Sequence, residues 1–291
     1  MNPINLKDFL ELFFALVKKY RKTLFIYLIS SILIGLTYSF SLKNIYKSES
    51  VLMRSEISRY DSSSDSAVSD LLNLDTSGDR TELLAKNIAK SRDFYFYFVQ
   101  KRDILPELVA VKKYYPKDQS ISYDSSLFNK DKREWRSVNP NKDIKELLKY
   151  HDLFLKHFQF IVDRKTKVVS INTFHLSPYI AQQWSTWFIE DLNTYISINE
   201  IDNAQNLYDF LTSQLPKTPS AEIRKQIGNI MLINLRKISL SQRSSEYAYE
   251  VIDKPSLPIR KDSPRRSIIM IIFFLLGLIA AGVRIYIAEK F

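Results

Sequence analysis

The chain has 291 residues, with 42 lysines and arginines against 32 acids, a formal net charge of +10 and no cysteine. Its length suggests one or two domains, and a chain without cysteine has no disulfides and no thiolate metal ligands. The basic residues are scattered among the acids and no recognition motif accompanies them, so we expect no nucleic-acid partner. A solvated surface with membrane-flanking anchors explains the charge better.

Two uncharged apolar runs lie near the two ends of the chain. Residues 23–42, and residues 267–283 extended past Arg284 to Ile287, are each long enough to cross a bilayer as a helix. The first run is too long for a removable signal peptide and lacks a small-residue cleavage site. We therefore expect transmembrane helices at residues 23–42 and 267–287, with one central domain at residues 43–266 between them.

The charges beside the two runs give conflicting topologies. Four basic residues among residues 18–22 precede the first run and predict a cytoplasmic N-terminus, whereas four among residues 260–266 precede the second. The first helix usually dominates, and long loops translocate largely regardless of charge. We therefore expect residues 1–22 and 288–291 to be cytoplasmic and the central domain to be periplasmic, in a bacterial inner membrane.

Small residues recur at every fourth position within both apolar runs. They are Ser31, Gly35 and Ser39 in the first run and Gly277 and Ala281 in the second. This spacing allows two helices to approach closely, so we take these residues as candidates for helix packing. The alternative is a coincidental share of small residues in a membrane helix.

The first half of the central domain alternates short elements with polar segments. The expected elements are a strand at residues 46–55, a surface loop at 59–80, a helix at 81–104 followed by Pro106, a polar excursion at 112–142 around an isolated Trp135, and a short helix at 143–156. Alternating residues at 158–162 and 168–174 then predict a hairpin, which the strands at 46–55 and 249–252 could complete into a small sheet.

A long amphipathic helix is predicted from Pro178 to Gln214, with Ser177 as its capping residue. At 1.5 Å per residue this helix would be about 55 Å long, more than a compact domain of this size needs. Residues 217–219 break it, and Ser220 caps a second helix that returns toward the membrane. We expect residues 178–245 to form a protruding helical arm; the alternative is an ordinary hairpin inside a globule.

No motif in the chain predicts catalysis. His151, His157 and His175 lack a second ligand at metal-binding spacing, so we expect them to be surface or half-buried residues. The chain has no phosphate-binding loop and no nucleophile elbow. The acid pair Glu190 and Asp191 lies on a predicted amphipathic helix, where charged residues usually form the solvated face. We expect no catalytic residue, no metal site and no cofactor.

A proline-rich segment precedes the second apolar run. Pro255, Pro258 and Pro264 predict a stiff, extended approach to the membrane, because proline fixes its own φ and restrains the preceding residue. Arg265 and Arg266 follow and would anchor at lipid headgroups. The segment could contact a partner or could simply steer the chain into the bilayer.

Four stretches, in order, carry a resemblance to a known family: residues 89–98 (AKSRDFYFYF), 123–135 (YDSSLFNKDKREW), 160–184 (FIVDRKTKVVSINTFHLSPYIAQQW) and 246–266 (EYAYEVIDKPSLPIRKDSPRR). With the two apolar runs, the chain resembles the polysaccharide co-polymerases of the O-antigen chain-length determinant (Wzz-like) type. The three prolines occupy the family's pre-membrane proline-rich segment, and Gly277 and Ala281 match the small residues of its second span.

The resemblance implies an α+β fold: two transmembrane helices flanking a periplasmic α/β base, with a long protruding helical arm. It implies a non-enzymatic regulator of glycan chain length that assembles into a homo-oligomeric ring. Its partners would be a separate inner-membrane polymerase, the growing lipid-linked glycan and membrane lipids. Two alternatives are a co-polymerase for capsule or exopolysaccharide export and a periplasmic sensor. The short cytoplasmic ends leave little room for the output domain of a sensor.

Overall fold

The computed structural model describes residues 18–55, 85–136, 139–140, 143–163, 165–166 and 168–290. The expected loop at residues 59–80 and most of the expected cytoplasmic segment, residues 1–22, lie outside these ranges. The chain divides into two compact units, one formed by residues 1–45 and 261–291 and the other by residues 46–260.

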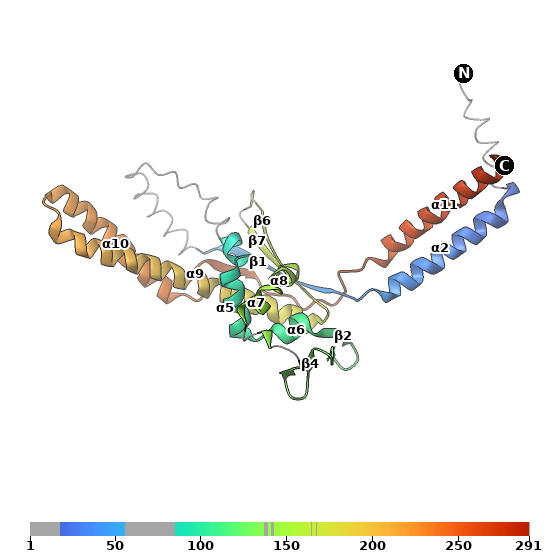
Figure 1. Ribbon diagram of the computed structural model, residues 1–291. Helices are drawn as coiled ribbons and strands as arrows, with labels where there is room; N and C mark the ends of the chain where they lie inside the picture. Colours follow the sequence, from blue (N-terminus) through green and yellow to red (C-terminus); the bar gives the residue numbers. More distant parts are fainter. Residues whose placement is uncertain are drawn as a thin grey trace, which may run out of the picture. The chain divides into compact units, whose positions relative to one another are not determined.

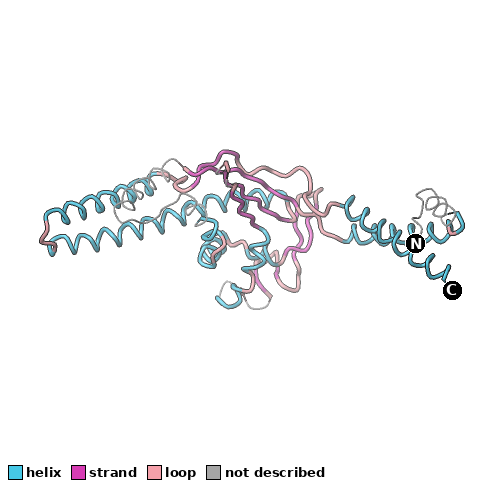
Figure 2. Tube along the Cα trace, turned by 90° about the horizontal axis from the view of Figure 1, so that it is seen from above, coloured by secondary structure: helices cyan, strands magenta, loops and turns pink. Residues whose placement is uncertain are grey.

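The first unit is a pair of helices, α2 (Arg21–Ser41) and α11 (Arg266–Lys290), which lie side by side (Figures 1 and 2). At one end of the pair Lys19 Nζ lies 2.7 Å from Glu289 Oε1, and at the other the Arg266 guanidinium lies 4.7 Å from the Phe40 ring centroid. The helices are therefore antiparallel. Both are long and apolar enough to cross a membrane, and their side chains are mostly exposed, as lipid-facing side chains would be.

The second unit contains a four-stranded antiparallel sheet in the order β6-β7-β1-β8. Its strands are β1 (Tyr46–Arg54), β6 (Phe158–Val162), β7 (Val168–His175) and β8 (Tyr249–Asp253). The predicted hairpin and its two predicted partner strands are thus confirmed. The fold class is also confirmed: an α+β domain with a long helix, between two long terminal apolar helices that pack together.

An aromatic core joins the sheet to the helices of this unit. The helices are α5 (Arg92–Arg102), α6 (Leu105–Val109), α7 (Ile144–Leu148), α8 (His151–His157) and the long α9 (Pro178–Gln214). Phe188 of α9 lies at the centre, stacked on Phe158 with centroids 4.6 Å apart and edge-on to Phe94 at 5.3 Å. Because aromatic side chains bury large areas, this cluster fixes the first half of α9 against the base.

The expected helix at residues 81–104 is interrupted. Residues 85–89 are helical, and α5 begins only at Arg92, where Ser91 Oγ accepts a hydrogen bond from Phe94 N at 3.1 Å. A serine that caps a new helix ends the preceding one, because the capping residue has extended rather than helical backbone. The expected short helix at 143–156 is likewise divided into α7 and α8.

The polar excursion predicted at residues 112–142 contains strands that the sequence analysis did not predict. This region contains two small hairpins, β2 (Val111–Tyr115) with β3 (Ser120–Tyr123), and β4 (Phe128–Asn129) with β5 (Glu134–Trp135). Trp135 is not isolated either, since its ring lies 5.2 Å from that of the buried Phe128. The exposed lysines on β2 interrupt the alternation of apolar and polar residues from which strands are predicted.

The second half of α9 pairs with α10 (Ala221–Arg243) as a helical hairpin, and η2 (Leu215–Lys217) joins the two (Figures 1 and 2). The predicted cap of α10 is confirmed, because Ser220 Oγ accepts from Ile223 N. The predicted side-chain cap of α9 is wrong: Ser177 makes no such bond, and its backbone N donates instead to His175 Nδ1. A 3.2 Å ion pair between Lys237 and Glu200 links the two helices.

The acid pair on α9 is not on a solvated face. Asp191 is fully buried, and its carboxylate accepts from Arg102 Nε at 2.7 Å and Nη2 at 2.8 Å, with Lys101 Nζ also at 2.8 Å. The Arg102 guanidinium also lies 5.2 Å from the Trp187 ring centroid and bonds Glu190 at 2.9 Å. These contacts fix α5 to α9, and they give Asp191 a structural role as the buried partner of two cations.

We predict that Asp191→Ala destabilises the chain by about 3 kcal/mol, because it leaves the mostly buried Arg102 without its bidentate partner. The matched control is Glu190→Gln, at an exposed carboxylate of the same cluster, which should cost less than about 1 kcal/mol. Denaturant titration of the full chain in detergent, followed by tryptophan fluorescence, measures both. Equal losses for the two variants would contradict this role of Asp191.

Candidate functional site

The strongest candidate site is the contact between α2 and α11, where glycines allow the helices to approach. A Cβ added at Gly35 would lie 2.9 Å from Phe273 Cβ, and one added at Gly277 would lie 2.8 Å from Ser31 Cβ. Ser31 Oγ also donates to the Phe273 carbonyl oxygen. Three of the five small residues, Ser31, Gly35 and Gly277, therefore meet in one contact that larger side chains would force open.

The other two small residues are buried but lie away from this contact. Because the helices are antiparallel, Ser39 lies between this contact and the end of the pair at Arg266. Ala281 lies between the contact and the end at Glu289. Ser39 Oγ has no hydrogen-bond partner among the described residues. Gly282 contrasts with these positions, since nothing lies within 4 Å of a Cβ added there. The small residues are thus not equivalent, and Gly282 marks an open face of α11.

The last residues of the proline segment, which lead into α11, form backbone hydrogen bonds with Ile45, which follows α2. Ile45 N donates to Ser263 O, and Asp262 N donates to Ile45 O, both at 2.9 Å. Pro264 follows this bridge, Arg265 is exposed, and Arg266 Nη2 lies 3.4 Å from Asn44 Oδ1. The bridge holds the N-terminal end of α11 beside the C-terminal end of α2.

Pro255 and Pro258 belong to the second unit, where the segment runs along β1. Ser256 N donates to Glu49 O at 3.2 Å, and Pro255 O accepts from Gln182 Nε2 at 3.0 Å. Pro258 is half-buried. Pro255 and Pro258 thus lie in the second unit and Pro264 in the first, and a shared role of the three prolines stays a prediction.

A groove of about 590 Å³ lies beside this connection, between α9 and the residues around β8. Its polar lining includes Gln182, Thr186, Thr194, Glu246 and Lys254. Asn193, which also lines the groove, ties α9 to residues 248–249: its Oδ1 accepts from Ala248 N and Tyr249 N, and its Nδ2 donates to Tyr249 O. Sequence reasoning missed this groove, because its walls come from segments some 60 residues apart.

The prediction that all three histidines are at most half-buried is wrong for His175, which is 2% exposed. Its Nδ1 accepts from Ser177 N at 3.0 Å, so Nε2 carries the proton toward Glu107 O at 3.3 Å. Burial, reinforced by His157, lowers the pKa of His175 to about 3. His175 is therefore a neutral packing residue. No group of three possible metal ligands occurs within the described ranges.

Comparison with known proteins gives structural matches only. No family model matches the sequence, and no curated protein matches it. The structure matches a full-length bacterial polysaccharide co-polymerase over 99% of this chain and 98% of that chain, with 12% identity and a TM-score of 0.41. It also matches a fragment of WzzB, a polysaccharide co-polymerase from Salmonella Typhimurium, over 76% of this chain and 100% of that one, with 13% identity and a TM-score of 0.31.

We predict that Gly277→Leu separates α2 from α11, because its side chain would occupy the space of Ser31. Cysteines at Lys19 and Glu289, whose side chains meet in the wild type, report the pairing through a short bifunctional cross-linker, since the chain has no other cysteine. Gly277→Leu should reduce the cross-linked yield in membranes several-fold. Gly282→Leu is the matched control and should leave the yield unchanged; equal yields in both would refute the contact.

Proposed function

We propose that this chain is a polysaccharide co-polymerase of the chain-length determinant type. It would be a non-enzymatic regulator of the length of a surface polysaccharide, lipopolysaccharide O-antigen, made by a separate inner-membrane polymerase. The observation that carries the proposal is the pairing of two terminal apolar helices through Gly35 and Gly277. In the sequence, these helices precede and follow an α/β unit with a long helical hairpin. The four resembling sequence stretches lie within or beside that unit.

In this proposal the paired helices span the inner membrane, with both termini in the cytoplasm and the central unit in the periplasm. The basic residues at 18–22 support this orientation through the positive-inside rule. Arg265 and Arg266 would then be headgroup anchors on the periplasmic side. The proposed segments are residues 1–22, 23–42, 43–266, 267–287 and 288–291; the helices themselves run from Arg21 to Ser41 and from Arg266 to Lys290.

The α9–α10 hairpin supports assembly into a homo-oligomeric ring. Six large apolar side chains on it are between 42% and 67% exposed: Ile198, Leu207, Phe210, Ile223, Leu232 and Leu235. Apolar side chains gathered on one element commonly mark a protein–protein contact. Hairpins packed against those of neighbouring copies would cover them. A ring would also repeat each weak contact with the polymerase or the lipid-linked glycan, and linked weak sites gain avidity.

We predict that helix pairing is needed for length control. In an O-antigen-producing host, the lipopolysaccharide ladder should show a preferred O-antigen length, the mode. Deletion of the gene should abolish this mode, and the wild-type gene should restore it. The double variant Gly277→Leu/Ala281→Leu should fail to restore the mode, whereas Gly282→Leu should restore it. Immunoblots of membrane fractions control for protein level.

An unchanged ladder on deletion would overturn the O-antigen assignment. If deletion instead abolished export of a capsule or exopolysaccharide, the chain would be an export co-polymerase, which shares the two-span plan. If the double variant, present at normal level, still restored the mode, the small residues would have no part in length control.

A further inference from the structure

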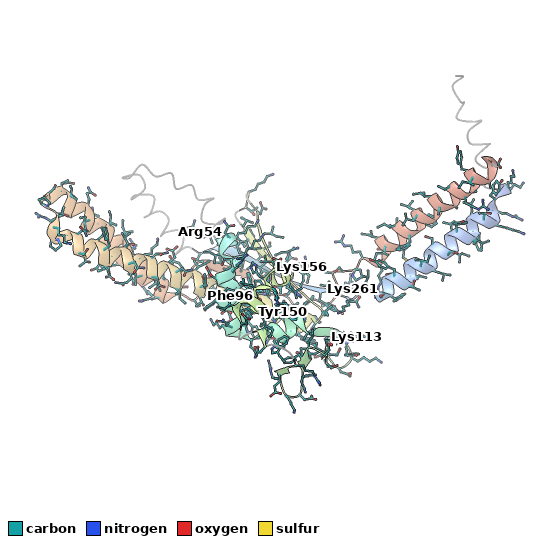
Figure 3. The ribbon with its side chains drawn as sticks, viewed as in Figure 1. Arg54, Phe96, Lys113, Tyr150, Lys156 and Lys261 are labelled. Carbon is teal, nitrogen blue, oxygen red and sulfur yellow. The ribbon has the colours of Figure 1, made fainter. Side chains whose placement is uncertain are left out.

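The β2–β3 hairpin is an exposed basic element without an assigned role. Its residues 111–123 include three lysines and one aspartate, a net charge of +2. Lys112, Lys113 and Lys117 are all exposed, and Lys113 lies on the outside of the unit (Figure 3). Its ammonium lies 5.1 Å from the ring centroid of Tyr115, which is itself 42% exposed. Exposed tyrosine beside lysine is typical of protein segments that lie at a membrane–water interface.

Tyrosines attach this hairpin to the first strand of the sheet. The ring of Tyr114 packs edge-on against that of Tyr46, with centroids 6.1 Å apart and an interplanar angle of 80°. Burial, together with the hydroxyls of Tyr179 and Tyr46, raises the pKa of Tyr114, in keeping with this packing. The hairpin is therefore held next to Tyr46, the first residue of β1.

Chain connectivity limits how far Tyr46 can lie from the end of α2. Only residues 42–45 separate it from Ser41, so the two Cα atoms are at most about 18 Å apart, whatever the arrangement of the two units. The headgroup layer occupies roughly 5–8 Å beyond the hydrocarbon core. The electrostatic potential of an anionic surface extends a further 8–10 Å at physiological salt. Lysine side chains beside Tyr46 are within reach of that potential.

We infer that the β2–β3 hairpin rests on anionic phospholipid headgroups, through Lys112, Lys113 and Lys117 with Tyr115 at the interface. This inference rests on the two-span topology of the proposed function. The other connection to the membrane helices has a similar composition: Leu257 is exposed, Ile259 is 94% exposed, and Arg260 and Lys261 follow. Isoleucine so exposed is unfavourable in water and favourable at a lipid interface.

The interaction has a predictable size. A basic side chain near an anionic surface shifts the ratio of bound to free states by about fivefold. Replacing all three lysines by glutamine should therefore lower the ratio of membrane-bound to free hairpin by up to roughly 100-fold. The contact should also disappear at about 1 M salt, where the Debye length falls to about 3 Å.

Site-specific fluorescence of the full chain in vesicles tests this. Because the chain has no cysteine, Ser120→Cys places a single dye on the hairpin and Leu33→Cys a single dye on α2. Vesicles of phosphatidylcholine, with or without phosphatidylglycerol, contain headgroup-labelled or acyl-chain-labelled quencher lipids. The hairpin dye should be quenched by the headgroup label when phosphatidylglycerol is present, and the triple lysine variant or high salt should remove this quenching.

The matched control replaces Lys90, Lys217 and Lys225, three exposed lysines elsewhere in the unit, and should leave the quenching unchanged. Equal quenching in neutral and anionic vesicles, or an equal effect of the two triple variants, would overturn the inference. Quenching of the Leu33 dye by acyl-chain label without quenching of the hairpin dye would also overturn it, while leaving the two-span topology intact. An unquenched Leu33 dye would overturn that topology and the inference with it.

Discussion

The antiparallel pairing of β1 with β8 brings together the two segments by which the chain enters and leaves the central unit. Four residues separate the end of α2 from the start of β1, and β8 leads through the proline segment into α11. Leu52 pairs with Val251, and the pairing continues as the Ser256–Glu49 hydrogen bond. The two connections between the central unit and the apolar helices therefore run side by side.

A single helix serves both parts of the central unit. The first half of α9 is packed by Trp184 and Phe188 into the aromatic core and tied to α5 through Asp191. No glycine or proline interrupts residues 179–214, so the second half continues as a stiff helix that only α10 accompanies among the described elements. The base is thus stabilised by its own core, whereas the hairpin leaves Phe210 and Leu232 exposed. This division of stability suits a base that holds position and an arm that meets neighbours.

Periodicity in the sequence predicted α9, α10 and all four strands of the main sheet, because each of these elements keeps an apolar face. It failed where partners come from distant segments. Asp191 is buried against Arg102, 89 positions away, and the buried His175 meets the backbone carbonyl of Glu107, 68 positions away. β2 was missed because its lysines interrupt the alternation. The spacing of small residues indicated a close helix contact but could not show that Gly35 meets Phe273 while Gly282 stays open.

We propose that two paired spans hold both chain ends in the cytoplasm and the central unit in the periplasm. Compartment-specific reporters measure this topology, one fused after Phe291 and one inserted between Lys217 and Thr218 at the turn of the helical hairpin. Alkaline phosphatase should be inactive at Phe291 and active at the turn, and green fluorescent protein should give the opposite pattern. Active phosphatase at Phe291 would show that the C-terminus is periplasmic and that the proposed topology is wrong.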